Sequence, residues 1–338
     1  MKKILITGGA GFIGSFVAKL AIKKGYKVIN VDNLSYAGSK FNIASILKHP
    51  NHTFIKANIT NNKKITAIFN KNKPNYVMHL AASSHVDNSI KNPRDFIKDN
   101  IQGTYNLLQV SYQYYKNLTK KHLFKFHYIS TDEVYGSLGK KDLFNEKSNY
   151  SPNNPYSASK ASGELLVRSW NKTYGLPTLI TNCSNNYGPF QHSEKLIPVV
   201  ILNALSNKKI PVYGNGKNIR DWLYVEDHAE ALLTVINKGQ IGSSYNVGDN
   251  NELTNIKIAK KICSILESKF NKKKLFSNLI EYVDDRPGHD FRYAIDSSKI
   301  RKELKWRPKT DFDDGLNKTI DWYIKNKDYL LKKQKKGI

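Results

Sequence analysis

The sequence predicts an α/β fold, in which a doubly wound parallel sheet is joined to a smaller C-terminal lobe that binds substrate. Up to about residue 180, short apolar runs alternate with longer amphipathic stretches, a pattern typical of strand–helix units in a parallel sheet. The first apolar run leads directly into a glycine-rich turn. After about residue 183 the elements become shorter and richer in Gly, Asn and Pro, which indicates a second unit of different construction.

The expected strands are mostly apolar along their length, which favours a sheet covered by helices on both faces. We predict these strands at residues 3–7, 27–31, 53–57, 76–80, 124–130 and 178–182. Helical patterns separate them at residues 12–24, 62–72, 93–115 and 155–174. In the C-terminal lobe the sequence predicts helices near residues 194–206, 225–237 and 255–270.

Composition describes an ordinary globular protein. Of the 338 residues, 40% are hydrophobic and 24% are charged. No apolar stretch approaches the roughly 20 residues that a membrane-spanning helix needs, and the first residues show no signal-peptide core. Cys183 and Cys263 are the only cysteines, too few for a disulfide framework or a cysteine-based zinc site. We therefore expect a reduced, cytoplasmic setting, no membrane partner and no bound metal.

The net charge of +26 is the one unusual bulk property, and such a charge can indicate a nucleic-acid partner. Only seven of the 54 basic residues are arginine, so 47 are lysine, whereas arginine is favoured for bidentate contacts with bases and phosphates. The lysines are spread along the chain without a binding motif, although residues 326–338 form a lysine-rich tail. A basic nucleic-acid-binding protein is therefore a remote alternative, and we expect no nucleic-acid partner.

The run Gly8-Gly9-Ala10-Gly11-Phe12-Ile13-Gly14 predicts a dinucleotide-binding turn of the Rossmann type. It follows the first strand and opens the first helix, where glycines permit a tight turn and let a pyrophosphate reach the helix N-terminus. Asp32 ends the second strand, 18 positions after Gly14. A carboxylate there accepts hydrogen bonds from the ribose hydroxyls and repels a 2′-phosphate, so the sequence favours NAD over NADP.

Three further segments belong to the expected cofactor cleft. Leu80, Ala81 and Ala82 end the fourth strand, where small residues allow the backbone to pass close to a cofactor. Asn58 follows the third strand, and its amide can both donate to and accept from an adenine. Asn100 lies in the next helical pattern and either contacts the cofactor or occupies a helix surface; the sequence leaves both interpretations open.

Tyr156 and Lys160 lie four residues apart, on one face of a predicted helix. Asn154 and Pro155 before them are typical of an N-cap followed by proline in the first turn. Free tyrosine has a pKa of about 10, so a neighbouring cation and the helix N-terminus are needed to favour its phenolate at neutral pH. Such a pair alone is usually only helix surface, but behind a dinucleotide-binding turn it favours alcohol oxidation by a nicotinamide.

Thr131, Asp132 and Glu133 follow the mostly apolar run 124–129, at the carboxyl end of a predicted strand, where open α/β sheets bind ligands. The Thr131 hydroxyl can hydrogen-bond the alcohol that is oxidised. Two adjacent carboxyls can act as acid and base when their surroundings push their pKa values apart, although a solvated acidic loop is the ordinary alternative. Together with Tyr156 and Lys160, they predict an enzyme that oxidises a sugar and then removes water from it.

These motifs resemble those of the extended short-chain dehydrogenase/reductase superfamily and, within it, those of the dTDP-glucose 4,6-dehydratases of deoxysugar (rhamnose) biosynthesis. The resemblance runs from Met1 to about Tyr323. Its most specific piece is the Asp132–Glu133 pair, which epimerase relatives usually lack. The segments that carry it are 8–14, 32–38, 84–87, 130–136, 156–160, 182–189, 194–198, 220–227 and 285–290.

The resemblance implies an internal redox cycle that converts dTDP-glucose to dTDP-4-keto-6-deoxyglucose, a hydro-lyase reaction. Tyr156 would remove the C4 hydroxyl proton, aided by Lys160 and Thr131, while NAD takes the C4 hydride. Glu133 would then remove the C5 proton and Asp132 would protonate the departing C6 hydroxyl. The hydride would finally return to C6, so that the cofactor ends as it began.

The resemblance also implies two sets of binding residues. For the cofactor they are Gly8, Gly11, Phe12, Ile13, Gly14, Asp32, Asn33, Leu34, Ser35, Asn58, Ile59, Leu80, Ala81, Ala82, Asn100, Tyr156, Lys160 and Asn186. For the substrate they are Ser84, Thr131, Asn185, Lys195, Leu196, Pro211, Tyr213, Arg220, Asn255, Arg286 and His289. Arg220 and Arg286 suit a diphosphate clamp, because guanidinium groups bind phosphate oxygens bidentately; a pair of surface ion-pair arginines is the alternative.

Three positions depart from the family pattern. Ser83 stands where the family commonly has Glu, Asn88 where it has Arg, and Ser193 where it has Pro. Ser83 follows a strand end that lines the predicted site. Its difference from the family pattern therefore bears on tuning of that site or on sugar preference. None of the three belongs to the catalytic set.

The main alternative is another nucleotide-sugar enzyme of this fold: a 4,6-dehydratase with a different base, a 4-epimerase or a decarboxylase. We divide the chain into an NAD-binding domain at residues 1–182 and a mainly substrate-binding lobe at 183–325, with some segments crossing back, followed by the tail at 326–338. The resemblance implies a homodimer, with the helices at 93–115 and 155–174 at its interface.

Overall fold

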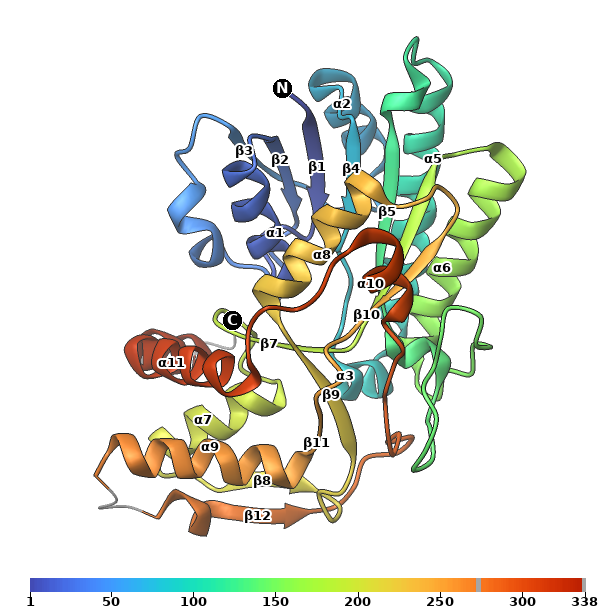
Figure 1. The fold of residues 1–338 in the computed structure, drawn as a ribbon. Helices are drawn as coiled ribbons and strands as arrows, with labels where there is room; N and C mark the ends of the chain where they lie inside the picture. Colours follow the sequence, from blue (N-terminus) through green and yellow to red (C-terminus); the bar gives the residue numbers. More distant parts are fainter. Residues whose placement is uncertain (272–274, 336–338) are drawn as a thin grey trace.

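The computed structural model describes residues 1–271 and 275–335 of the chain. Its main layer is a seven-stranded sheet in the order β10-β6-β5-β4-β1-β2-β3, with helices on both faces (Figure 1). Every neighbouring pair in this sheet runs parallel. The strand order reverses at β1, which lies between β2 and β4, and open α/β sheets bind ligands at such a point. The predicted doubly wound α/β fold is confirmed.

The predicted strands agree with the observed ones to within one residue at each end. They are β1 (Lys3–Thr7), β2 (Lys27–Asp32), β3 (His52–Lys56), β4 (Tyr76–His79), β5 (Lys125–Thr131) and β6 (Thr178–Cys183). Most of their residues are buried, since helices cover both sides of the sheet. The shared register, with Thr7 beside Val31 and His79, brings the carboxyl ends of the central strands to one edge.

The predicted helix at residues 93–115 is interrupted, while α1 (Phe12–Lys23), α2 (Asn62–Asn72) and α6 (Pro155–Tyr174) match their predictions. The interrupted stretch consists of α4 (Pro93–Phe96), a π-helical turn η2 (Ile97–Gln102) and α5 (Gly103–Lys116), after a short α3 (Val86–Lys91). A π turn changes the helical register locally. Hydrophobic periodicity averages over several turns and therefore does not detect it.

Two elements of the C-terminal half return to the main sheet. The strand β10 (Ser244–Val247) pairs with β6, and α8 (Val225–Lys238) shares one buried apolar cluster with α1. Ile300 and Leu304 of α10 (Ser298–Leu304) join the same cluster. Some crossing back was expected. The assignment of residues 183–325 as mainly substrate-binding stays a prediction.

The remaining elements build the lower part of the molecule in Figure 1 around a second apolar cluster. Strands β7 (Asn185–Tyr187), β9 (Ile219–Tyr224) and β11 (Glu252–Thr254) form one small sheet, and β8 (Ile210–Tyr213) pairs with β12 (Ile280–Val283). The helices are α7 (Leu196–Leu205), α9 (Asn255–Lys269) and α11 (Phe312–Lys335). Short 3-10 turns complete the fold at η1 (Lys40–Ile46), η3 (Lys121–Leu123), η4 (Asp132–Tyr135) and η5 (Phe276–Leu279).

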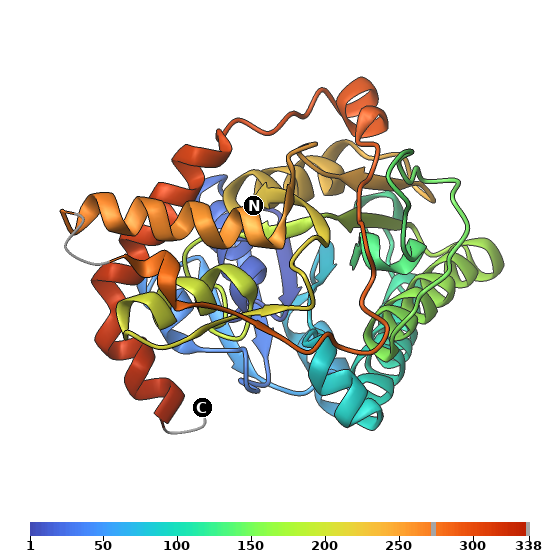
Figure 2. The ribbon, with the colours of Figure 1, turned by 90° about the horizontal axis from the view of Figure 1, so that it is seen from below.

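A strap, residues 284–297, connects β12 to α10. Seen from below, it runs past α3 and α6 (Figure 2). The strap is held by backbone hydrogen bonds, from Leu138 N to Arg292 O and from Phe144 N to Ala294 O. It thereby brings the segment 285–290, which carries part of the family resemblance, beneath the main sheet's ligand-binding edge.

Residues 326–335 continue α11, which corrects the separate tail that the lysine-rich composition predicted. Tyr329 stacks on Phe41 with ring centroids 4.2 Å apart, and Trp322 lies 4.7 Å from Phe190. The contact with Phe41 holds the helix against the first domain. The lysine-rich composition of this segment does not reveal its aromatic contacts. Residues 336–338 of the predicted tail lie outside the described part of the chain.

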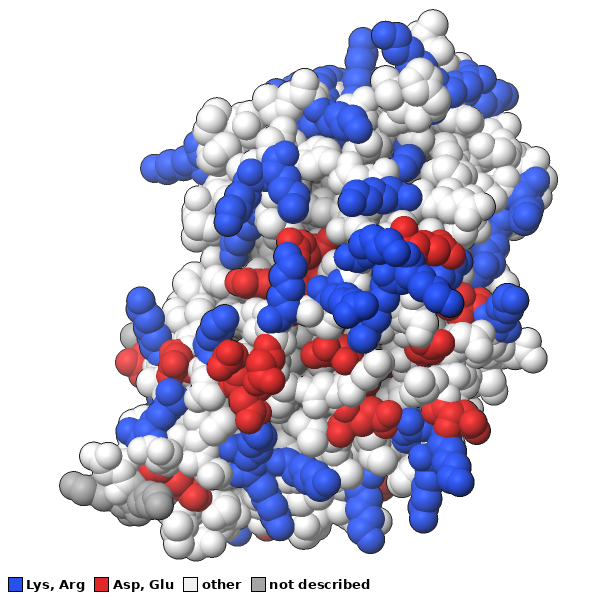
Figure 3. All heavy atoms as spheres, viewed as in Figure 1, with Lys and Arg blue, Asp and Glu red and all other residues white. Residues whose placement is uncertain are grey.

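Basic side chains are spread over the face in Figure 3, with acidic side chains among them and a denser basic group over α10. Within residues 1–271 and 275–335, no helix combines the length and the apolar character needed to cross a bilayer. The same residues contain no group of three or more His, Cys, Asp or Glu side chains arranged to hold a metal ion.

Candidate active site

A cavity of about 280 Å³ opens at the carboxyl ends of the central strands. It is lined by the turn between β1 and α1, by the ends of β2, β4, β5 and β6, and by the start of α6. Residues 183–195 close its other side. The cavity therefore lies where the strand order reverses, between the main sheet and the lower part of the molecule.

The turn after β1 fits the pyrophosphate of a dinucleotide. Gly8 has φ of 72°, a conformation that favours glycine. A Cβ at Gly14 would lie 2.1 Å from the Gly8 carbonyl oxygen, so the close approach of the turn to α1 requires glycine there. The first residues of α1 line the cavity, and an anion can approach the backbone N–H groups at a helix N-terminus.

Asp32 is buried at the end of β2 and lines the cavity. Its Oδ2 accepts from Ala10 N at 2.9 Å and its Oδ1 accepts from Leu34 N at 2.7 Å. Burial raises the pKa of this carboxyl, and the two backbone hydrogen bonds oppose that rise. Each oxygen keeps a second lone pair, so the carboxylate can also accept from a ribose hydroxyl.

All but two of the predicted cofactor residues line the cavity; the exceptions are Leu34 and Asn100. Leu34 has φ of 56° and donates its N–H to Asp32, so it shapes the turn after β2. Asn100 is buried in the π turn. Its amide accepts from Ser83 N at 2.8 Å and donates to Ser83 O at 2.9 Å and to Ser159 Oγ at 2.8 Å. Asn100 therefore fixes the loop after β4 against α6, a role that neither sequence interpretation included.

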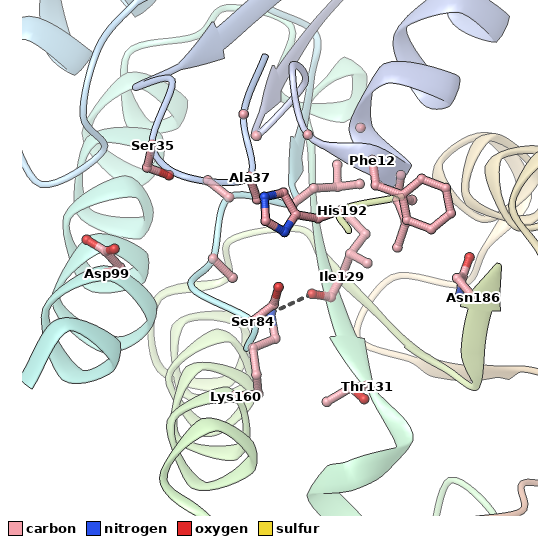
Figure 4. Close-up of a pocket in the computed structure, with 18 of the residues that line it drawn as sticks. Phe12, Ser35, Ala37, Ser84, Asp99, Ile129, Thr131, Lys160, Asn186 and His192 are labelled. Carbon is pink, nitrogen blue, oxygen red and sulfur yellow. Dashed lines mark hydrogen bonds between the residues drawn. The ribbon is translucent and has the colours of Figure 1, made fainter. Parts of the chain in front are cut away.

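The five predicted catalytic residues all line the cavity. Asn154 caps α6 by accepting from Ser157 N at 3.0 Å, with Pro155 as the first helical residue, as predicted. Tyr156 therefore lies in the first turn of α6, and its ring packs edge-on against Phe96. Figure 4 shows Lys160 extending from α6 toward β5, with Thr131 beside it.

Lys160 is buried and its ammonium donates to Ile129 O at 2.7 Å, 4.2 Å from the centroid of the Tyr128 ring. Burial lowers the pKa of Lys160 to about 8. Burial also raises the pKa of Tyr156 well above its usual value, and the Glu133 carboxylate adds to that rise. Among the described residues no hydrogen bond joins Lys160 to Tyr156, and the Lys160 ammonium donates to Ile129 O instead.

The two carboxyls have different surroundings. Asp132 is buried, and its pKa is raised well above the usual value by burial first and then by Glu133 and Asp221. Burial also raises the pKa of Glu133, but the charges of Lys195, Arg286 and Arg220 oppose it. Asp132 Oδ2 and Glu133 Oε2 are both buried without a hydrogen-bond partner among the described residues. The environment therefore favours a protonated Asp132 beside an ionised Glu133.

Ser84, Thr131, Asn185 and Lys195 of the predicted substrate set line the cavity. Lys195 Nζ donates to Ser84 O at 2.8 Å, which joins the start of α7 to the loop after β4. The other members of the set lie outside this lining; they are Leu196, Pro211, Tyr213, Arg220, Asn255, Arg286 and His289. Leu196 and Asn255 are the first residues of α7 and α9, and Pro211 lies in β8.

Two of these outer residues, Tyr213 and Arg286, meet at Asp87 of α3. Tyr213 OH donates to Asp87 Oδ2 at 3.2 Å, and Arg286 Nη1 lies 3.4 Å from Asp87 Oδ1. His289 Nδ1 lies 2.6 Å from Asp285 Oδ1 on the same strap. Arg286 Nε is buried without a partner in the described residues, so the guanidinium retains a donor for an anionic ligand.

Arg220 is buried, and its donors are directed to backbone carbonyls: Nη1 to Ile219 O at 2.7 Å and Nη2 to Asp290 O at 3.0 Å. Its guanidinium carbon lies 4.3 Å from the centroid of the Tyr293 ring. These contacts hold the strap, and they place a positive charge near Asp132 and Glu133. The diphosphate clamp at Arg220 stays a prediction.

Several residues that line the cavity were not predicted from the sequence, among them Asp99, His192 and Glu194. Ser83 Oγ donates to Asp99 Oδ2 at 2.8 Å, so the residue that departs from the family pattern holds a carboxyl at the cleft. Asp99 lies in the π turn, which no sequence signal indicates. Glu194 lies within a segment that carried the resemblance, and its Oε2 is 3.4 Å from His192 Nδ1.

Comparisons with known proteins agree with this geometry. A family model described as GDP-mannose 4,6 dehydratase matches residues 5–319. A dTDP-glucose 4,6-dehydratase of Escherichia coli is 52% identical, over 97% of this chain and 95% of that protein. One from Neisseria meningitidis serogroup B is 50% identical, over 97% of this chain and 94% of that protein.

Solved structures resemble the chain over its whole length. The crystal structure of dTDP-glucose 4,6-dehydratase from Bacillus anthracis, in complex with NAD, matches with a TM-score of 0.87 and 42% identity. That match covers 97% of this chain and 98% of the crystallised one.

Proposed function

We propose, from the premise that this chain belongs to the dTDP-glucose 4,6-dehydratase family of extended short-chain dehydrogenases/reductases, that it converts dTDP-glucose to dTDP-4-keto-6-deoxyglucose with loss of water. The observation that carries the proposal is the convergence of Thr131, Asp132, Glu133, Tyr156 and Lys160 on one cavity beside a dinucleotide-binding turn. A 4-epimerase or a decarboxylase needs no acid and base of this kind side by side at the end of β5.

Tyr156, Lys160 and Thr131 act on the C4 hydroxyl. NAD bound along the turn after β1 supplies the redox chemistry, by accepting a hydride and returning it. Tyr156 takes the hydroxyl proton, Thr131 Oγ1 orients the hydroxyl, and the Lys160 charge favours the phenolate form of Tyr156. The edge-on contact with Phe96 and the Asn154 cap fix the position of the Tyr156 ring.

Asp132 and Glu133 act on the neighbouring carbons. A ketone at C4 acidifies the C5 proton, which Glu133 removes as the ionised member of the pair. Asp132, held protonated by burial and by its neighbour's charge, gives its proton to the departing C6 hydroxyl. The pKa difference between the two carboxyls thereby assigns acid and base within one short segment.

The substrate's diphosphate is assigned to the basic side of the cavity. Lys195 lines it, and Arg286 keeps an unpartnered, buried Nε among the described residues. Asn185 Oδ1 and Asn255 Oδ1 are likewise buried without partners in that part of the chain. Buried polar atoms are normally hydrogen-bonded, so the three atoms of Arg286, Asn185 and Asn255 suit a polar ligand such as a nucleotide sugar.

The activity is tested by incubating the purified protein with dTDP-glucose and identifying the product by NMR. We expect a 4-keto-6-deoxy sugar with no net consumption of NAD, because the hydride returns to the sugar. GDP-mannose serves as the comparison substrate and should react far more slowly. A C4-epimerised or decarboxylated product, or no product with NAD-loaded protein, would contradict the proposal.

Asp32 predicts that the enzyme uses NAD and retains it through purification, because the cycle never requires its release. Protein stripped of cofactor and reconstituted with NAD should regain activity, whereas NADP should restore little, since its 2′-phosphate would meet the buried carboxyl. The measurement is the product formed per reconstituted cofactor. Equal activity with the two cofactors would show that Asp32 does not select between them.

We further propose that the chain forms a homodimer through α5 and α6. Tyr105 of α5 and Leu165 and Tyr174 of α6 are 49%, 57% and 46% exposed, an unusual number of large apolar side chains for neighbouring helices. Light scattering during size-exclusion chromatography measures the mass of the protein, which should be that of a dimer. Leu165→Glu should lower this mass toward that of the monomer. Rhamnose biosynthesis and a cytoplasmic location stay predictions of the family resemblance.

A further inference from the structure

The helix that carries Tyr156 and Lys160 also carries Glu164 and Arg168, each one turn after the last. Glu164 has no exposed surface and does not line the cavity. A carboxyl is costly to bury unless it is paired or hydrogen-bonded. The roles proposed above for the catalytic residues do not use this group, so its presence one turn from the catalytic lysine needs an explanation.

The contacts of Glu164 identify it as a hydrogen-bond acceptor. Its Oε1 accepts from Asn182 Nδ2 at 2.6 Å, and its Oε2 accepts from the Tyr150 hydroxyl. Arg168 Nη2 lies 3.9 Å from Oε2. Burial raises the pKa of Glu164, while the donors and the Arg168 charge oppose that rise. Donors surround both oxygens, which is the environment of a carboxylate rather than of a neutral acid.

The charge of Glu164 acts on Lys160. Of the groups around the ammonium, His79 comes from β4, Tyr128 from β5, Cys183 from β6, and Tyr156 and Glu164 from α6. Burial lowers the pKa of Lys160 to about 8, and Glu164 is the foremost of the groups that oppose this.

Glu164 is also connected to the catalytic strand end. Asn182 Nδ2, which donates to Glu164, donates as well to Thr131 O at 3.2 Å. The buried Glu164 carboxyl therefore accepts a hydrogen bond from Asn182, which in turn donates to the Thr131 backbone. The same carboxyl belongs to the residue one helical turn after Lys160. Thr131 and Lys160 are assigned to the oxidation of the sugar and not to the loss of water.

We propose that Glu164 is a positioning residue for the oxidation step, which keeps Lys160 charged and, through Asn182, holds the backbone of Thr131. This inference rests on the proposed function. It differs from a purely structural role in one measurable respect: a residue that only stabilises the core lowers activity equally at all pH values, whereas loss of the Glu164 charge makes Lys160 lose its proton at lower pH.

The test uses the full-length, NAD-loaded protein and follows NADH formation on mixing with dTDP-glucose, as a function of pH. The parent should lose the step as pH rises through the Lys160 pKa of about 8. Glu164→Gln should move this alkaline limb toward acid by about 1 pH unit, since a nearby opposite charge shifts a pKa by about 1 to 3 units. At the parent's midpoint the rate should fall roughly fivefold, with little change well below it.

Three matched variants separate charge from packing. Glu164→Asp keeps the charge and should restore the parent's alkaline limb. Tyr150→Phe removes a hydrogen bond to the carboxylate but not its charge, so it should lower thermal stability without an acid shift of the limb. Arg168→Gln, at a partly exposed position, removes a cation that favours the ionised form of Glu164, so it should move the limb slightly toward acid; it also provides the test if Glu164→Gln does not fold.

A second readout needs no substrate. The protonation of Lys160 is followed by the pH dependence of its side-chain NMR signal, identified by its loss in Lys160→Met, in the parent and in the Glu164→Gln background. Lys160 should lose its proton at lower pH in Glu164→Gln, because the opposite charge one helical turn away is gone. An identical alkaline limb and an identical Lys160 titration in Glu164→Gln would overturn the inference. A parent that forms no NADH with dTDP-glucose contradicts the proposed function instead, and the Lys160 titration then decides on Glu164 alone.

Discussion

Asp132→Asn combined with Glu133→Gln is expected to abolish water loss while leaving oxidation of the sugar at C4 intact. The two amides keep the shape of the side chains but remove the acid and the base. Each group of this kind typically contributes about 10² to 10⁴-fold, so product formation should fall by at least that range. Tyr156, Lys160 and Thr131 are unchanged, and NADH absorbance should therefore rise on mixing with dTDP-glucose and then persist.

The single variants give the control for this experiment. Glu133→Gln should accumulate NADH in the same way, because the C5 proton has no acceptor. Asp132→Asn should still exchange the C5 proton with solvent deuterium while losing little water, because only the acid is missing. If the double variant formed product at the parent's rate, the carboxyl pair would be a solvated loop and the proposed elimination would be wrong. The burial of both free carboxyl oxygens argues for a chemical role.

Tyr156→Phe is expected to give the opposite NADH signal. The phenylalanine retains the ring that packs against Phe96, but the C4 hydroxyl proton loses its acceptor. The rate at which bound cofactor is reduced should fall by at least about 10² to 10⁴-fold, and NADH should fail to accumulate even when Asp132 and Glu133 are also replaced. Rapid-mixing absorbance on NAD-loaded protein measures this directly.

An unchanged unfolding temperature and unchanged NAD retention in Tyr156→Phe would show that the loss is chemical. Cofactor reduction at the parent's rate would remove Tyr156 from the proposed mechanism. Together, the carboxyl and tyrosine variants divide the reaction, since one blocks it after oxidation and the other before it.

Local patterns in the sequence determined the main sheet and indicated the residues that we propose as the catalytic set. The strands, which are apolar on both faces, match β1 to β6 because a parallel sheet between two helical layers imposes that composition. A tight turn, a close helix approach and a strand-end carboxyl each require a particular residue type at a set spacing. Gly8, Gly14 and Asp32 could therefore be assigned from the sequence. The Asn154–Pro155 start of α6 is likewise local, and it places Tyr156 and Lys160 correctly.

Tertiary structure decided what depends on contacts between distant segments. The π turn directs Asn100 at Ser83 and Ser159 and brings Asp99 to the cavity, although a helical period predicts one unbroken helix. The aromatic contacts of Trp322 and Tyr329 order a helix whose composition indicates a tail. Burial raises the pKa of Glu133, and the charges that oppose this rise belong to Lys195, Arg286 and Arg220, which lie 62 or more residues away in sequence. Burial and through-space charge are properties of the folded chain. The sequence alone therefore contains these residues but does not show that they lie close together.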